Sequence, residues 1–386
     1  IPTISCKIIL DDGTEGLAMV PSGASTGSKE ALELRDGEKE YLGKGVLKAV
    51  QNINNVLGPS IIGKNPIEQQ LIDEILIKSD GTDDKSEYGA NAILAISLAV
   101  SHSASASNGS NLHEHFAHLY SKFYGKDIEQ SIPMPMLNIL NGGEHANNNI
   151  DIQEFMIVPS GASSFSQAMQ WSTEVYMNLK KIIEKFGHSS AVGDEGGFAP
   201  NLKNNEEALK LIISAITESD LEPGKDINIA LDCAASEFYD GKKYILKGED
   251  KIFSSEKLVE YLIDLVDKYP IISIEDGMDE NDIDGWKLLT EKIGKKCQLV
   301  GDDLFVTNKK ILIDGIEKNI ANAILIKFNQ VGTITETIQT IACANENGYK
   351  SIISHRSGET EDTTISDLAT GLGVGQIKTG APCRSD

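Results

Sequence analysis

The chain has 386 residues, of which 40% are hydrophobic and 24% are charged, and its formal net charge at neutral pH is -23. This composition is typical of a globular protein of about two domains. So large a negative charge excludes nucleic acid as an expected partner, because phosphate backbones would be repelled. An anionic substrate would need positive charge from nearby side chains or from a bound cation.

Two further features narrow the class of protein. The five cysteines are scattered and form no CxxC pair, which argues against a disulfide framework or a zinc site and favours a reducing, cytoplasmic location. The most apolar helical stretch, 90–100, is interrupted by Asn91 and Ser97 and is shorter than the ~20 residues of a membrane span. We therefore expect a buried core helix there and no membrane span.

The first part of the chain predicts a hairpin followed by helices. Apolar residues alternate along 4–10, and Asp11-Asp12-Gly13 is a hairpin turn signal. The segment PSGASTG at 21–27 has glycines that can absorb a hinge rotation, so it is either a mobile lid or a surface connection. From Gly45 to about Lys126, apolar residues recur at three- to four-residue spacing, which indicates helices.

After about residue 128 the pattern changes to short apolar runs that alternate with amphipathic helical stretches. Such alternation predicts parallel strands joined by helical crossovers, and eight strands favour a closed (β/α)₈ barrel. The eight candidate strands are 135–140, 154–158, 227–232, 271–275, 298–302, 323–327, 351–355 and 375–378.

Six consecutive runs each end in an ionisable residue, namely Asp232, Glu275, Asp302, Lys327, His355 and Lys378. The carboxyl ends of barrel strands share one mouth, where active sites lie, so we expect these side chains to converge. Three carboxylates in one mouth need a counter-charge, and an oxygen-only ligand set favours Mg²⁺ over zinc. Asp276 and Asp303 are adjacent acids, and alternation allows only one of each pair to face inward without saying which.

The other polar motifs suggest an acid–base reaction on a phosphorylated acid. A dication near Lys327 would lower the pKa of this lysine and let it act as a base, although Lys327 could instead simply pair with carboxylates. The segment HRSG at 355–358 offers a fork donor and a hydroxyl to a phosphate. Two glycine-rich loops, 141–145 and 193–197, contain a histidine and acids, respectively. Their backbone freedom either presents these side chains to the site or simply forms ordinary tight turns. Together these groups favour removal of a proton next to a carboxylate, with Mg²⁺ stabilising the resulting enediolate.

The chain resembles the enolase family along its whole length. The matching segments are PSGASTGSKEALELRDG at 21–37, GANAILAISLAV at 89–100, NGGEHANNNIDIQEFMIVP at 141–159, VGDEGGFAPNL at 192–202, DCAASEFYD at 232–240, SIEDG at 273–277, QLVGDDLFVTN at 298–308, ILIKFNQVGT at 324–333, SHRSGETEDTTISDLA at 354–369 and QIKTG at 376–380. Gln170-Trp171 and Cys233-Ala234-Ala235 resemble the bacterial branch of that family.

This resemblance implies a small N-terminal α+β domain over residues 1–127 that caps a C-terminal catalytic barrel over residues 128–386. It also implies that the second barrel strand is antiparallel. The implied activity is the glycolytic, Mg²⁺-dependent dehydration of 2-phosphoglycerate to phosphoenolpyruvate by a homodimer or larger homo-oligomer. A further strand before Ile1 and a last helix after Asp386 are implied too, so we expect the natural protein to be longer.

The resemblance also implies a role for each residue of the site. Two Mg²⁺ ions are expected per active site, the tighter one on Asp232, Glu275 and Asp302, and the second on Ser25. Lys327 resembles the base that takes the C2 proton, and Glu195 resembles the acid that helps the C3 hydroxyl leave, supported by Glu154. Substrate contacts are implied for Ala24, His145, Gln153, His355, Arg356, Ser357 and Lys378, with Arg356 and Ser357 on the phosphate.

Two other functions remain as alternatives at this point. A racemase or cycloisomerase on the same scaffold would share the metal and the base, but the phosphate-directed SHRSG and the acidic loop GDEGG speak against it. A non-catalytic scaffold or surface adhesin of the same fold would be signalled by loss of a catalytic residue, and none of the matched positions is lost.

Overall fold

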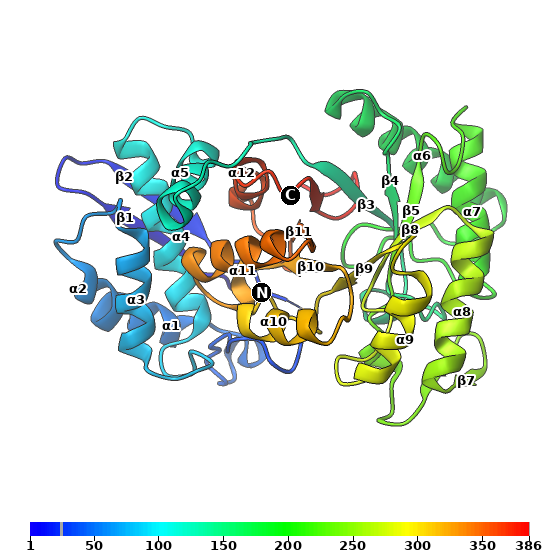
Figure 1. Ribbon diagram of the computed structural model, residues 1–386, viewed down its shortest axis with the longest axis horizontal. Helices are drawn as coiled ribbons and strands as arrows, with labels where there is room; N and C mark the ends of the chain where they lie inside the picture. Colours follow the sequence, from blue (N-terminus) through cyan, green and yellow to red (C-terminus); the bar gives the residue numbers. More distant parts are fainter. Residues whose placement is uncertain (24–25, 386) are drawn as a thin grey trace.

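The computed structural model describes residues 1–23 and 26–385, which form an N-terminal region beside a closed β-barrel. Figure 1 shows the N-terminal region in blue and cyan on the left, the green and yellow part of the barrel on the right, and the orange and red part between them. In the described part of the chain, none of the helices combines the length and apolar character that crossing a bilayer requires.

The N-terminal region begins with the predicted hairpin, formed by β1 (Ser5–Ile9) and β2 (Glu15–Met19) in antiparallel register. The turn includes Gly13 at φ +85°, a left-handed backbone that glycine adopts without strain. The hairpin lies against a long helix so closely that a Cβ on Gly16 would meet the backbone oxygen of Ala99 at 2.3 Å. Glycine at this position therefore sets how near the strand can approach the helix.

Helices fill the rest of this region, as the apolar spacing predicts. They are α1 (Leu47–Asn52), α2 (Gly58–Ile61), α3 (Gln69–Asp80), α4 (Ala90–Ser107) and α5 (Leu112–Tyr124), with short turns η1 (Glu40–Gly43) and η2 (Ile53–Leu57). The predicted core helix is α4, whose residues are almost all buried. Its two polar interruptions have partners: Asn91 accepts from the Leu34 amide at 3.0 Å, and Ser97 accepts from the Ile334 amide at 3.0 Å. Ser97 thus joins α4 to the barrel half of the molecule.

All eight predicted strands are confirmed, and they close into one barrel. In barrel order they are β10 (Ala323–Ile326), β11 (Lys350–Ser354), β12 (Gln376–Lys378), β3 (Met134–Asn141), β4 (Glu154–Val158), β5 (Asn228–Asp232), β8 (Ile271–Glu275) and β9 (Gln298–Gly301). As the resemblance implied, β4 runs antiparallel to both of its neighbours. Its connection from β3 contains only the short turn η3 (Gly143–His145), which cannot supply the long crossover that a parallel strand requires.

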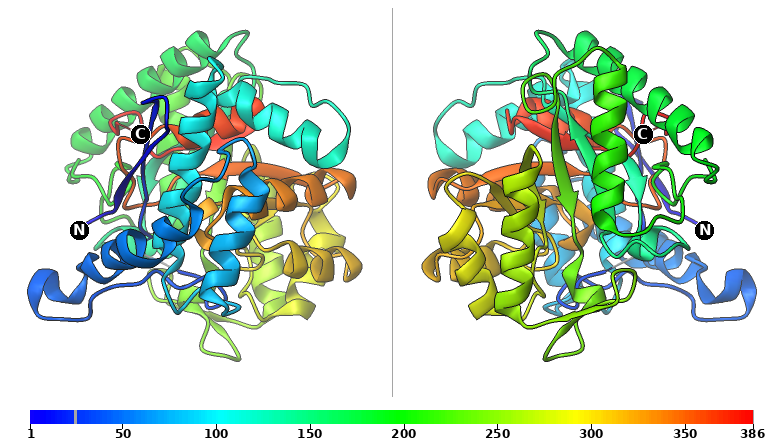
Figure 2. Two further views of the ribbon diagram at one scale, coloured as in Figure 1. Left: turned by 90° about the vertical axis from the view of Figure 1, so that its left-hand side faces the viewer. Right: turned by 90° about the vertical axis from the view of Figure 1, so that its right-hand side faces the viewer.

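Helices surround the barrel on its outer face (Figure 2). They are α6 (Phe165–Lys185), α7 (Asn205–Glu218), α8 (Ser255–Lys268), α9 (Ile283–Ile293), α10 (Lys309–Glu317), α11 (Ile334–Glu346) and α12 (Thr364–Gly371), and a small hairpin of β6 (Tyr244–Leu246) and β7 (Lys251–Phe253) precedes α8. Most begin at a residue whose side chain accepts from the first turn, which supplies a partner for otherwise unpaired amides. These caps are Ser164, Asn204, Ser254, Asp282, Asn308 and Thr333.

The barrel interior is apolar below the mouth, and this determines which residues reach the mouth. Its core contains Met136, Met156, Val158, Ala230, Val300, Ala323, Leu325 and Ile352. Because successive strand residues face opposite sides, the next inward position after Val300 is Asp302, and the next after Leu325 is Lys327. The sequence patterns of β9 and β10 thus carry an apolar floor and a polar end in the same alternation.

Candidate active site

The mouth of the barrel gathers acids from neighbouring strands around one lysine. Lys378, the last residue of β12, has its Nζ 3.0 Å from both carboxylate oxygens of Glu275, 3.2 Å from Glu154 Oε2 and 3.3 Å from Asp232 Oδ2. Glu154 reaches this point from the first residue of β4, because that strand runs in the opposite direction and its start lies beside the end of β5. Strands β4, β5, β8 and β12 therefore meet at one ammonium group.

The charges at this centre perturb one another strongly. Burial, followed by the neighbouring Asp232, raises the pKa of Glu275 well above its usual range. Burial alone would lower the pKa of Lys378, but Glu154 and Glu275 raise it well above normal instead. The lysine is 2% exposed, so its charge is retained only because carboxylates surround it.

A second cluster lies where β9 and β10 end. Lys327 and Asp302 follow these strands directly, and Lys327 Nζ lies 2.5 Å from Asp302 Oδ2. Burial would raise the pKa of Asp302, but the Lys327 ammonium outweighs this effect and lowers it. In return, Asp302 overcomes the effect of burial on Lys327 and raises the pKa of that lysine. The dication expected from the sequence would act in the opposite direction on Lys327.

The structure places the two adjacent acids, Asp276 and Asp303, differently from their neighbours. Both carboxylate oxygens of Asp276 accept backbone amides, from Asp302 at 2.9 Å and from Asp303 at 2.8 Å. Burial and the charge of Asp302 raise the pKa of Asp303 to about 8. Glu275 and Asp302 contact the lysines of the mouth, whereas Asp276 fixes the loop that carries Asp302.

A third cluster contains two carboxylates and two histidines. Glu195 Oε2 lies 3.4 Å from His355 Nε2 and accepts from Asn138 Nδ2 at 3.2 Å, while Glu195 Oε1 lies 3.9 Å from His145 Nε2. His145 Nδ1 faces Glu154 Oε1 at 3.5 Å. Burial would raise the pKa of Glu195, but His355 and His145 hold it well below normal, whereas burial and the charge of Glu195 raise that of Glu154. The two carboxyls therefore differ in environment, since Glu195 faces two histidine rings and Glu154 faces only His145 among them.

The two glycine-rich loops bring this third cluster together. The Asp194 amide donates to the His145 carbonyl at 3.0 Å, so the loop before Glu195 is attached to the loop that ends in His145. A Cβ on Gly193 would lie 2.5 Å from that carbonyl oxygen, so only glycine permits this contact. Gln153, next to Glu154 in sequence, contacts the first cluster, because its Nε2 donates to Asp232 Oδ2 at 3.3 Å.

Arg356 lies beside the segment predicted as a lid. Its guanidinium is 3% exposed and donates to Glu30 through Nη1 at 3.0 Å and Nη2 at 3.3 Å, and to Asn329 Oδ1 at 3.1 Å. A cavity of about 410 Å³ adjoins these groups, and its lining includes Gly23, Glu30, Asn329 and Arg356. Ser22 and Gly358 exchange backbone hydrogen bonds of 3.0 and 2.9 Å, which attach the predicted lid to the segment that holds the partly buried Ser357. Ala24 and Ser25 lie outside the described residues.

The donor set of the mouth suits a hard divalent cation. Two groups of described side chains bring possible ligand atoms within 4.8 Å of one another: Asp276, Asp302 and Asp303, and His145, Glu154 and Glu195. Asp302 belongs to the first group, whereas the other predicted ligands, Asp232 and Glu275, both contact the Lys378 ammonium. The carboxylates of the mouth exceed the positive charges beside them, and oxygen ligands of this kind fit Mg²⁺.

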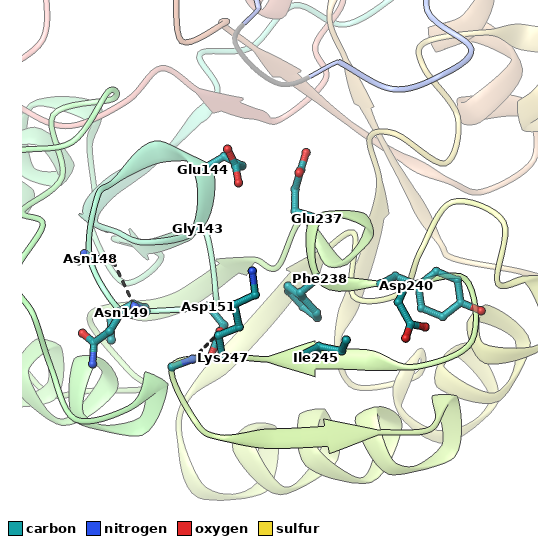
Figure 3. A pocket seen from close by; sticks show the side chains of 13 residues that line it. Gly143, Glu144, Asn148, Asn149, Asp151, Glu237, Phe238, Asp240, Ile245 and Lys247 are labelled. Atoms are coloured by element: carbon teal, nitrogen blue, oxygen red, sulfur yellow. Dashed lines mark hydrogen bonds between the residues drawn. The ribbon is translucent and has the colours of Figure 1, made fainter.

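A separate cavity of about 330 Å³ lies between the loop 143–151 and the segment 237–248. Figure 3 shows the side chains that line it, with Glu144 and Glu237 at one side. Gly143 and Glu144 directly precede His145, so this cavity adjoins the turn that carries the histidine. The clustered side chains of the mouth do not line it.

Three residues of the site do not stand at the end of an apolar run, so the strand-end pattern did not predict them. Glu154 begins its strand rather than ending it, and only the resemblance pointed to it. Glu30 and Gln330 contact the site from a loop and from the turn η5 (Phe328–Gln330). Gln330 comes three residues after Lys327, and this spacing across a strand-to-helix connection is the one local sign that could have identified it.

The comparison with known protein families agrees with this architecture. The family described as "Enolase, N-terminal domain" matches residues 1–116, and the one described as "Enolase, C-terminal TIM barrel domain" matches residues 129–386. The two matches together cover nearly the whole chain, in the order in which the N-terminal region and the barrel follow each other. The chain therefore belongs to the enolase family and is a hydro-lyase.

Proposed function

We propose that this enolase removes water from 2-phosphoglycerate through the residues gathered at the barrel mouth, with the reverse reaction at the same site. The observation that carries this proposal is the convergence of Glu154, Asp232 and Glu275 on the Lys378 ammonium, all within 3.3 Å. A dense, buried set of acids and lysines can remove one proton and deliver another within a single substrate's length.

Lys327 is proposed as the base that takes the proton from C2. Its Nζ is held by Asp302 at 2.5 Å, and its side chain is 12% exposed, so its position is determined before substrate arrives. Removal of the C2 proton places negative charge on the substrate carboxylate. Lys378 is proposed to contact the substrate as well, and its ammonium favours that charge.

Glu195 is proposed as the acid that assists loss of the C3 hydroxyl as water. The neighbouring histidines lower the pKa of Glu195, so Glu195 must gain a proton before it can donate one. His145 and His355, whose ring nitrogens face Glu195, are placed to adjust this proton and to contact substrate. Gln153 and Ala24 complete the proposed substrate contacts.

Arg356 and Ser357 are proposed to bind the phosphate. A planar guanidinium matches phosphate oxygens in a fork geometry, and a serine hydroxyl can add a further hydrogen bond. Asp232, Glu275 and Asp302 would hold the first Mg²⁺ ion and Ser25 the second. When bound, the metal supplies positive charge that stabilises the enediolate.

The assembly and domain limits are proposals on the family's pattern. We propose that the chain forms a homodimer or larger homo-oligomer, and that the capping domain spans 1–127 and the barrel domain 128–386. A sedimentation measurement of the intact protein would test the proposed oligomer. A mass equal to that of one chain would contradict it.

The function is tested by following the ultraviolet absorbance of the enol product from 2-phosphoglycerate. Absorbance should increase with Mg²⁺ present, stop on addition of a chelator and resume when Mg²⁺ is restored in excess. Turnover that continues unchanged in chelator would contradict the metal assignment. Turnover of a non-phosphorylated hydroxy acid, with none of 2-phosphoglycerate, would favour the racemase-like alternative.

A further inference from the structure

Gln330 lies between two ion pairs of the proposed active site. On one side its Nε2 donates to Asp302 Oδ1 at 2.8 Å, and the other oxygen of Asp302 is bound to Lys327. On the other side the same Nε2 donates to Glu30 Oε1 at 3.3 Å, and Glu30 accepts two bonds from Arg356. One amide therefore contacts both the base side and the phosphate side of the mouth.

The orientation of the Gln330 amide is determined by a chain of hydrogen bonds. The Lys327 backbone amide donates to Thr307 Oγ1 at 2.9 Å, so the hydroxyl directs its own hydrogen elsewhere. Its near acceptor is Gln330 Oε1 at 2.6 Å, while the Leu325 carbonyl is more distant at 3.5 Å. Gln330 Oε1 thus faces the hydroxyl, and Nε2 must face the two carboxylates.

This orientation is energetically enforced because the amide of Gln330 and the hydroxyl that orients it are both buried. Gln330 is 1% exposed and Thr307 is fully buried, so neither can exchange its partner for water. A reversed amide would place Oε1 against Asp302 and Glu30 and leave both carboxylates without that donor. Hydrogen bonds to buried charged groups are among the stronger ones, and losing such a partner leaves an unmatched charge.

The backbone of Gln330 adds a second connection to the segment that follows the predicted lid. Its carbonyl accepts the Ala31 amide at 2.9 Å, next to Glu30. Gln330 therefore contacts Glu30 through its side chain and Ala31 through its main chain. A change at Arg356 or Glu30 reaches Asp302 through a single rigid group.

We propose that Gln330 is a positioning residue that couples the phosphate-binding side of the mouth to the acid–base side. This inference rests on the proposed function of Arg356, Asp302 and Lys327. When phosphate engages Arg356, the charge that Glu30 presents to Nε2 changes, and the amide transmits this change to Asp302. Substrate affinity and turnover then depend on the same side chain, although Gln330 itself contacts no reacting atom.

The test compares steady-state kinetics of variants with 2-phosphoglycerate. Gln330→Met keeps the approximate volume but removes both hydrogen-bonding groups, and it should lower kcat/KM by about 10- to 100-fold, with KM raised and kcat lowered. Thr307→Val removes only the hydroxyl that orients the amide, and it should change both constants in the same direction by about 3- to 10-fold. Thr307→Ser restores the hydroxyl and should remain within about twofold of wild type.

Gln298→Met provides the matched control. Gln298 is the first residue of β9, at the end of the barrel opposite Asp302, and its amide donates to Ser273 Oγ at 3.1 Å. A purely structural role would make the Gln330 and Gln298 variants alike in KM and in kcat, and this result would overturn the proposal. A Gln330→Met effect confined to kcat, with KM unchanged, would overturn it too.

Two further outcomes remain distinguishable. If Gln330→Met does not fold, the Thr307→Val and Thr307→Ser pair decides, because equal kinetics for the two would contradict the coupling. An inactive wild type would mean failure of the proposed function, whereas an active wild type with unaffected variants would mean failure of this inference alone.

Discussion

The same strands build the floor of the barrel, which is its apolar interior, and the mouth of the barrel, where charged side chains gather. On β10, Ala323 and Leu325 belong to the apolar core, and Lys327 follows them in the same inward alternation. On β9, Val300 is followed in the same way by Asp302. The floor is filled with side chains that need no partner, whereas Lys327, Arg356 and Lys378 at the mouth are each paired with acids.

This difference teaches how the fold separates stability from chemistry. Burial at the floor stabilises the barrel by the hydrophobic effect. Burial at the mouth works against the charged forms and is tolerated only because lysines and acids pair, as the raised pKa of Glu275 and the lowered pKa of Asp302 show. Substitutions in the two zones should therefore affect different measured quantities.

The largest effect is expected from loss of the proposed base. Lys327→Ala should lower turnover of 2-phosphoglycerate by about 10²- to 10⁴-fold or more, because a positioned base contributes this much. Lys350→Ala is a suitable control, since Lys350 is exposed at the first residue of β11, away from the mouth. Circular dichroism should show both variants folded. Turnover of the Lys327 variant near that of the control would exclude this lysine as the base.

Glu195→Gln should have the next largest effect on turnover, by about 10²- to 10³-fold. The amide keeps the size of the side chain and can still accept from Asn138, but it cannot donate a proton to the leaving hydroxyl. Product formation followed by ultraviolet absorbance measures this effect. A variant with turnover within a few-fold of wild type would remove Glu195 from its proposed role.

A floor substitution should affect stability instead. Leu325→Ala removes a fully buried side chain two residues before Lys327 and should lower the free energy of unfolding by about 2–5 kcal/mol. Denaturant titration measures this loss, while kcat of the folded protein should change by less than about tenfold. Complete loss of activity with unchanged stability would show that floor and mouth are not separable.

Asp73 is a buried carboxylate outside the mouth that accepts hydrogen bonds from the neutral residues Gln69 and Thr335. It accepts from the Thr335 amide at 3.0 Å and from the Thr335 hydroxyl at 2.6 Å, joining α3 to α11, and burial raises its pKa from 3.8 to about 6. Because the folded protein holds this proton more tightly than the unfolded chain, the contribution of Asp73 to stability is greatest below about pH 4. It decreases as pH rises to about 6 and is constant above.

Melting temperatures across this pH range test the statement. As pH rises from about 4 to about 6, the stability of wild type should fall relative to that of Asp73→Asn, since asparagine does not ionise. The expected change is about 1–3 kcal/mol, the smallest of the series. A difference that does not depend on pH would contradict a raised pKa at this position.

The sequence predicted the strands and the convergent strand ends because alternation and apolar runs are local properties. It left open whether Glu275 or Asp276 faces the mouth, since neighbouring acids look alike until the backbone turn at φ +41° after β8 is known. The strand-end pattern did not predict Glu154, because β4 runs antiparallel to its neighbours and its first residue lies at the mouth. Gln330 and Glu30 lie 300 residues apart in sequence, and no local pattern records so distant a contact.

The central claim, that base and acid act from separate clusters of one mouth, is tested most directly by isotope exchange at C2 of 2-phosphoglycerate in heavy water. The account predicts that Lys327→Ala abolishes this exchange, whereas Glu195→Gln retains it although dehydration is slowed. Near-normal exchange in Lys327→Ala, or equal loss of exchange in both variants, would contradict the account.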